Sequence, residues 1–133
     1  MSNIEPASRR FARRLLSLLS ILAAGIAGYL LIVALGKQGL PVGCGGESGC
    51  AEVLTSRWSV VFGIPVSAPA LLVYLTVFAA SLKTAQPQFR FVLLAAAVMM
   101  LLAAIWFTTL QFVVLKALCP WCLTEHALGA VMS

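Results

Sequence analysis

The sequence predicts an all-α membrane protein, folded as a four-helix transmembrane bundle with an extracytoplasmic loop and a short interfacial helix. Of its 133 residues, 62% are hydrophobic and only 10% are charged. The mean hydropathy of +1.04 lies far above that of a soluble domain. Long uncharged runs recur along the chain, with basic residues beside them as topology signals. At this length we expect a single domain covering residues 1–133.

The first predicted span covers residues 15–35. This run is uncharged, and at ~1.5 Å per residue it is long enough to cross the hydrocarbon core of a bilayer. Arginines precede it and place the N-terminus in the cytoplasm. A secretory signal peptide is the alternative, because a basic start and small residues at 23–28 also fit one. However, the apolar core of a signal peptide is usually only ~7–15 residues long.

Residues 36–63 form a polar, glycine-rich stretch that we expect to be an extracytoplasmic redox loop. It contains Cys44 and Cys50. Residues 52–62 mix apolar with polar side chains, which predicts a short helix lying along the membrane interface. Trp58 either anchors this helix at headgroup depth or packs in the core.

Residues 66–82 and 91–115 are the next two predicted spans. The connection between them, residues 83–90, is short and carries Lys83 and Arg90, so it belongs in the cytoplasm. The third span therefore runs outward again and brings the chain back to the side of the redox loop.

The outer half of the third span contains three polar residues, Thr108, Thr109 and Gln111. They are interpreted in two ways. They line a pocket, or the threonines bond to their own helix while Gln111 meets a neighbouring helix.

The fourth helix is predicted at residues 120–133. Pro120 suits a first helical turn, and only residues 116–118 separate the preceding span from the cysteine pair. Residues 123–133 would cover roughly 16 Å, which is too short to cross a bilayer. We therefore expect the fourth helix to be incomplete in this sequence.

Basic residues set the predicted orientation. The expected cytoplasmic side carries Arg9, Arg10, Arg13, Arg14, Lys83 and Arg90, and the opposite side carries Lys37, Arg57 and Lys116. This bias predicts a multi-pass protein of the cell inner membrane, with the N-terminus cytoplasmic and both cysteine pairs extracytoplasmic. Membrane lipid is thus an expected partner. The net charge of +5 would favour nucleic acid in a soluble protein, but topology accounts for it here and we expect no nucleic-acid partner.

The chemistry is predicted to lie in two cysteine pairs, Cys44 with Cys50 and Cys119 with Cys122. A C-x-x-C pair at a helix start favours the reactive thiolate. Two dithiols on one side of a membrane can pass electrons by thiol exchange, in which a thiolate attacks a disulfide and a second thiol resolves the mixed intermediate. Glycines beside the loop pair allow it to move, whereas the helix holds the second pair.

Other uses of the four cysteines lead to different functions. A non-enzymatic membrane metal-binding or assembly protein would hold zinc or copper with them, and His126 could be a further ligand. Two static disulfides would make the protein purely structural. A c-type haem is excluded, because Leu123 stands where that motif needs histidine.

Glu125 and His126 follow Cys122 at offsets of three and four, on the same helix face. Ionisable residues in an apolar helix indicate function, and His126 could transfer a proton or bond a reducible carbonyl. The alternative is that both residues reach water at the interface.

Taken together, these segments resemble bacterial members of the vitamin K epoxide reductase family. The resemblance rests on Gly43-Cys44, Gly49-Cys50, Val53 to Trp58, Gly63-Ile64-Pro65 with Tyr74 beyond it, and Cys119-Pro120-Trp121-Cys122. It implies a four-helix bundle around a quinone, with Cys122 facing the ring and Cys119 exchanging with a loop cysteine. The loop pair would then oxidise a separate thioredoxin-like periplasmic protein.

The resemblance also implies cofactor contacts. Ser56 matches a loop serine near the quinone. Gln111 and His126 are the other candidate cofactor-binding residues, chosen for their polarity within apolar helices. Val66 replaces an asparagine found in some relatives. His126 stands where vertebrate enzymes have tyrosine, which favours a respiratory quinone, ubiquinone or menaquinone, as the cofactor.

Overall fold

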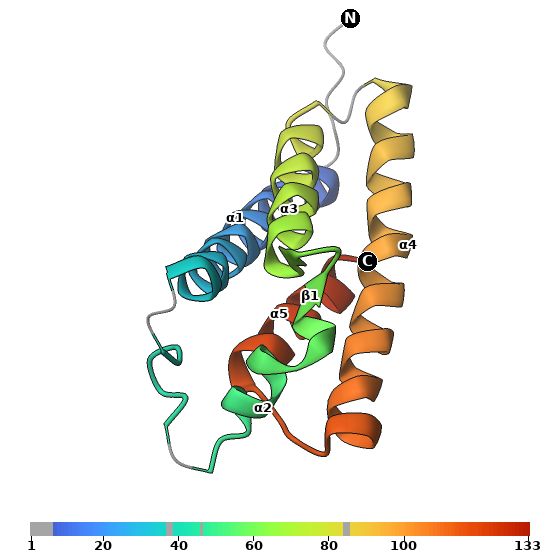
Figure 1. Cartoon of the computed structure of the whole chain (residues 1–133). Coiled ribbons are helices and arrows are strands. Elements are labelled where there is room, and N and C mark those ends of the chain that lie inside the picture. The colour runs from blue at the N-terminus through green and yellow to red at the C-terminus, as the bar shows by residue number, and fades with distance from the viewer. Residues whose placement is uncertain (1–6, 37–38, 46, 84–85) are drawn as a thin grey trace, which may run out of the picture.

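The computed structural model describes residues 7–36, 39–45, 47–83 and 86–133 and is mainly helical (Figure 1). Lys37, one of the basic residues predicted on the side opposite the cytoplasm, is not among these described residues. The elements follow in chain order: α1 (Ala7–Gly36), α2 (Cys50–Thr55), the 3-10 helix η1 (Arg57–Ser59), β1 (Val60–Val61), β2 (Ile64–Pro65), α3 (Ser67–Ser81), α4 (Pro87–Thr109), the π-helix η2 (Leu110–Leu115) and α5 (Pro120–Met132).

Small side chains pack α1 against α3. Ala23, Ala24 and Ala27 of α1 are at most 5% exposed and belong to one buried cluster with Tyr74 and Val77 of α3. Small residues let helix backbones approach closely, which is how helices associate where lipid is as apolar as the protein interior. The two helices accordingly lie side by side in Figure 1.

Serine hydroxyls join the same two helices. The Oγ atoms of Ser17 and Ser81 lie 2.8 Å apart. Ser20 donates to the backbone oxygen of Ser17 at 3.0 Å, and Ser81 donates to that of Phe78 at 2.6 Å. Because these hydroxyls bond to each other or to their own helices, they can be buried without the cost of an unpaired polar group.

Two helices are long and apolar enough to cross a membrane. They are α1 and the continuous segment Pro87–Leu115, and each contains an 18-residue window of mean hydropathy 2.5. Together with the apolar composition, they indicate a membrane-associated, helical protein. Helices α3 and α5 have 15 and 13 residues, fewer than the ~20 that a span usually needs. The four-helix transmembrane arrangement therefore stays a prediction.

The loop differs from the single helix predicted over residues 52–62. Helix α2 begins at Cys50 and ends at Thr55, and a hairpin follows in which Val60 pairs with Pro65 and Val61 with Ile64. The turn between them places Phe62 and Gly63 at φ of 52° and 81°. Two consecutive residues with positive φ form the tight turn that twisted hairpins favour, so the helix cannot continue through this segment.

Candidate active site

A break in regular α-helix brings the chain to Cys119. Helix α4 loosens into the π-turn η2, where the backbone oxygen of Gln111 accepts the N–H of Ala117 at 3.1 Å. Lys116 then takes a left-handed conformation, with φ 49°. This tight reversal sets Cys119 as the residue that caps the N-terminus of α5.

The side chain of Gln111 fixes the backbone of Cys119. Its Oε1 accepts the N–H of Cys119 at 2.8 Å, and Gln111 is only 2% exposed. Its Nε2 is also buried and has no hydrogen-bond partner among the described residues. The amide therefore holds Cys119 with one end and presents a free donor with the other.

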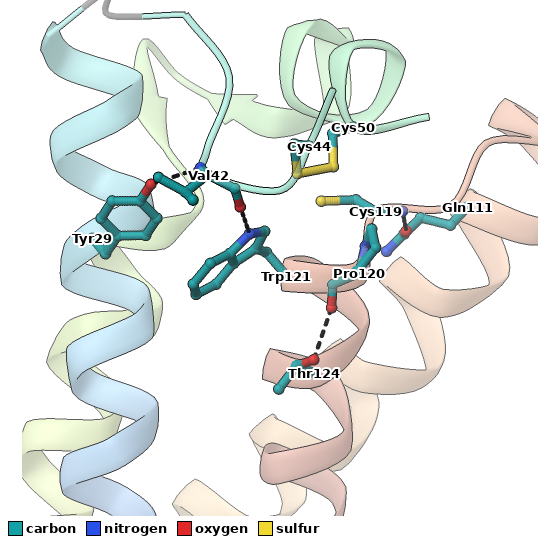
Figure 2. The surroundings of a disulfide bond; sticks show 9 residues. All are labelled: Tyr29, Val42, Cys44, Cys50, Gln111, Cys119, Pro120, Trp121 and Thr124. Atoms are coloured by element: carbon teal, nitrogen blue, oxygen red, sulfur yellow. Dashed lines mark hydrogen bonds between the residues drawn. A yellow bond between two sulfur atoms is a disulfide. The ribbon is translucent and has the colours of Figure 1, made fainter. Parts of the chain in front are cut away.

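Three of the four cysteines meet in one buried cluster. Cys44 and Cys50 form a disulfide, and the Sγ atoms of Cys44, Cys50 and Cys119 all lie within 4.8 Å of one another. Each of the three residues is at most 1% exposed. Figure 2 shows the Cys119 sulfur pointing toward the disulfide. A thiol is thus placed beside a disulfide where water has little access.

Gly49 allows this close approach of the loop to the α4–α5 connection. It has φ 66°, and a Cβ atom at this position would lie only 2.8 Å from the backbone nitrogen of Leu118. Glycine tolerates both the left-handed conformation and the contact. Because Gly49 immediately precedes Cys50, this contact brings the disulfide to Cys119.

The two cysteines of the C-x-x-C motif are reduced and differ in surroundings. Cys119 is buried and Cys122 is partly exposed. The pKa of Cys119 is lowered to about 7, chiefly because the Cys122 thiol hydrogen-bonds to its sulfur, and burial acts in the opposite direction. A substantial fraction of Cys119 is therefore the nucleophilic thiolate at neutral pH.

Comparison with known proteins agrees with this geometry. A model of the vitamin K epoxide reductase family matches residues 14–133, which include all four cysteines. The chain belongs to the vitamin K epoxide reductase family. Membership makes it an oxidoreductase and accords with its membrane-associated, helical character.

Other residues that the sequence of this vitamin K epoxide reductase family member singles out have contacts of their own within the fold. Ser56 donates its hydroxyl to the backbone oxygen of Val53 at 2.8 Å. His126 stacks on Phe107, with ring centroids 5.6 Å apart and planes 8° apart. Thr109 bonds to the backbone oxygen of Ile105 at 2.7 Å, as the second interpretation of that segment expects.

Glu125 is buried rather than at a wet interface. It is 6% exposed, and neither carboxyl oxygen has a hydrogen-bond partner among the described residues. Its backbone oxygen accepts the Tyr74 hydroxyl at 3.3 Å. In a vitamin K epoxide reductase family chain, such a buried carboxyl on the same helix as the C-x-x-C motif is a candidate for function.

Sequence reasoning missed two aromatic residues beside the disulfide. The rings of Tyr29 and Trp121 lie 5.1 Å apart, and both side chains bond to the backbone of Val42. Trp121 lies inside the C-x-x-C motif, so the sequence indicates that it is close to the cysteines but not which residue it bonds to. Tyr29 lies at the outer end of an apolar run, and nothing in its local sequence links it to the loop.

Proposed function

We propose that this oxidoreductase is a quinone-dependent thiol-disulfide oxidoreductase that generates disulfides outside the cytoplasm. The observation that carries the proposal is the placement of Cys119, with its lowered pKa, within 4.8 Å of both sulfurs of the Cys44–Cys50 disulfide. Thiol exchange needs this juxtaposition of a thiolate and a disulfide. Family membership supports the same chemistry.

Electrons move from the loop pair to the motif pair by two exchanges. In the reduced loop, one thiolate attacks Cys119 of an oxidised motif, the Cys119–Cys122 bond breaks, and Cys122 leaves as a thiolate that takes up a proton. The second loop cysteine loses its proton and attacks the first, which closes Cys44–Cys50 and releases Cys119. The Cys44–Cys50 disulfide and the free thiols of Cys119 and Cys122 match the state that these steps would leave, which supports the proposed direction.

The residues around Cys119 fit a quinone. The buried Nε2 of Gln111 is an unused donor beside Cys119, and a quinone carbonyl is an acceptor that could satisfy it. Gln111 and His126 would hold the ring, with Ser56 as a further contact. A bound quinone, ubiquinone or menaquinone, supplies the acceptor for the two electrons and two protons that leave Cys119 and Cys122 as they close a disulfide.

A thioredoxin-like protein of the periplasm is the proposed electron donor. Its dithiol would reduce Cys44–Cys50 by the same exchange and become oxidised. The clustering of the loop pair with Cys119 supports placing both pairs on one side of the inner membrane, with a cytoplasmic N-terminus. Both loop sulfurs are buried, so this step requires the loop to leave Cys119.

Quinone reduction by detergent-solubilised protein tests the function. A reduced thioredoxin-like substrate is supplied, and quinone absorbance is followed for wild type, Cys122→Ala, Cys50→Ala and the exposed-loop control Glu47→Gln. We expect turnover in wild type and Glu47→Gln and none in the cysteine variants. Equal turnover in all four proteins would overturn the relay.

The three clustered sulfurs also support a second candidate, a metal-binding or assembly protein. If the loop disulfide were reduced, three thiolates within 4.8 Å of one another would suit a zinc or copper ion. Metal analysis of reduced, purified protein separates the two functions. Stoichiometric metal that is lost on alkylation of the thiols, with no quinone turnover, would favour the metal-binding function.

A further inference from the structure

Both backbone groups of Val42 are held by aromatic side chains from two different helices. Its N–H donates to the Tyr29 hydroxyl of α1 at 2.9 Å, and its carbonyl accepts the Trp121 Nε1–H of α5 at 2.9 Å. Figure 2 shows Val42 between the two rings, at the edge of the site that holds the disulfide. The loop is thus attached to the bundle two residues before Cys44.

Hydrogen bonds, rather than side-chain burial, hold Val42 in place. The Val42 side chain is 79% exposed, so it contributes little apolar burial to docking. Cys44 is tied to the same segment by a backbone hydrogen bond, because its N–H donates to the oxygen of Pro41 at 3.0 Å and closes a turn. A restraint on Val42 therefore also restrains the disulfide. A segment fixed at residues 41–44 leaves Cys44 little freedom to move.

The docked loop withholds its disulfide from other proteins. Cys44 is 1% exposed and Cys50 is 0% exposed, and Val53, Leu54 and Trp121 pack around the cluster. A protein thiol must reach a sulfur atom to attack it. The same docking that presents the disulfide to Cys119 therefore hides it from the outside.

We propose that Tyr29 and Trp121 form a clamp on Val42 that positions the Cys44–Cys50 disulfide on Cys119, and that release of this clamp admits the outside thiol partner. The proposal rests on the proposed function. It assigns Tyr29 and Trp121 as positioning residues for the exchange. Because Trp121 lies between Cys119 and Cys122, the clamp ties the loop directly to the motif with which it exchanges electrons.

Reduction of the loop disulfide by a phosphine tests the clamp without any quinone or protein partner. Tris(2-carboxyethyl)phosphine reduces the disulfide to two thiols and takes oxygen from water to become the phosphine oxide. The Cys119→Ser background removes the competing internal thiol, and the freed thiols are counted by maleimide labelling above the constant signal from Cys122. Tyr29→Phe and Trp121→Phe each remove one hydrogen bond to Val42 and keep an aromatic ring.

We expect each clamp variant to be reduced about fivefold faster, the effect of losing one hydrogen bond of ordinary strength. The matched control is Trp58→Phe, since the centroid of the Trp58 ring lies 6.0 Å from that of Trp106, whereas the side chains that bond to Val42 are those of Tyr29 and Trp121. Its reduction rate should equal that of the background. Unchanged rates in both clamp variants would overturn the proposal, as would an equal acceleration in Trp58→Phe.

Amide hydrogen exchange at Val42 is a second measurement. Tyr29→Phe should speed exchange at this amide while leaving exchange within α3 unchanged, and no change at Val42 would contradict the clamp. Both readouts are independent of turnover. If the wild type lacks quinone reduction but the clamp variants show these accelerations, the proposed function fails and the clamp stands.

Discussion

Cys119 is the residue on which the exchange chemistry depends. Its sulfur accepts a hydrogen bond from Cys122 and faces a disulfide, and its backbone is fixed by Gln111. Reactivity and position are thus set by two different neighbours. Cys122 favours the thiolate form in which Cys119 leaves the mixed disulfide, and Gln111 fixes the backbone that places the Cys119 sulfur beside the loop.

Ionisation of Cys119 should depend on pH with a midpoint near 7. Its pKa is lowered to about 7, so the thiolate fraction rises as pH increases from 6 to 8 and then levels off. Cys122→Ala removes the hydrogen bond that lowers this pKa and should move the midpoint up toward the ordinary thiol value of ~8.5. The ultraviolet absorbance of the thiolate measures both profiles and needs no reagent to reach the buried sulfur. A midpoint that is the same in both proteins would contradict this explanation.

Gly49→Ala should undock the loop. The added Cβ would meet the Leu118 backbone at 2.8 Å, and φ 66° is unfavourable for alanine by ~1–2 kcal/mol. We expect a lower thermal midpoint and faster phosphine reduction of Cys44–Cys50. Gly45→Ala is the control, because a Cβ on Gly45 meets nothing within 4 Å. Similar behaviour of the two alanine variants would show that the Gly49 contact is unimportant.

At the scale of elements, small side chains at the contact between α1 and α3, here called the seam, determine how closely these two helices approach. Ala27→Leu adds a large side chain at a position that is 1% exposed and should destabilise the fold by ~1–3 kcal/mol through overpacking. The same substitution at exposed Ala103 of α4 is the control. Thermal unfolding in detergent measures both. A smaller loss of thermal stability for Ala27→Leu than for Ala103→Leu would contradict close packing at the seam.

The helices are the elements that the sequence indicates best. Uncharged runs mark them because burial and lipid exposure both require apolar side chains. The ends are less evident: α1 begins at Ala7, within the arginine-rich stretch, because charged residues are compatible with a helix outside the hydrocarbon. The hairpin at Val60–Pro65 was missed, since strands of two residues depend on their neighbours in space rather than on periodicity.

At the scale of the whole molecule, topology brings distant cysteines together. The sequence predicts both pairs on one side of a membrane, because spans of fixed length alternate in direction, and the clustering of Cys44, Cys50 and Cys119 is consistent with that prediction. It could not show that the disulfide is buried or that Tyr29 and Trp121 hold Val42, since these contacts join residues 13 and 79 positions apart. The sequence predicts a loop cysteine pair that can move, whereas in this structure the loop is docked beside Cys119.

Trapping the mixed disulfide tests the central claim, that Cys119 exchanges with the loop disulfide. Two double variants, Cys50→Ser with Cys122→Ser and Cys44→Ser with Cys122→Ser, each lack both thiols that could resolve the intermediate and keep Cys119 with one loop cysteine. On mild oxidation a bond between these two remaining cysteines should accumulate. The protein is alkylated in acid, digested and examined by mass spectrometry. We predict a peptide that joins Cys119 to Cys44 or Cys50. Complete alkylation of Cys119 and of the remaining loop cysteine in both double variants would contradict the relay.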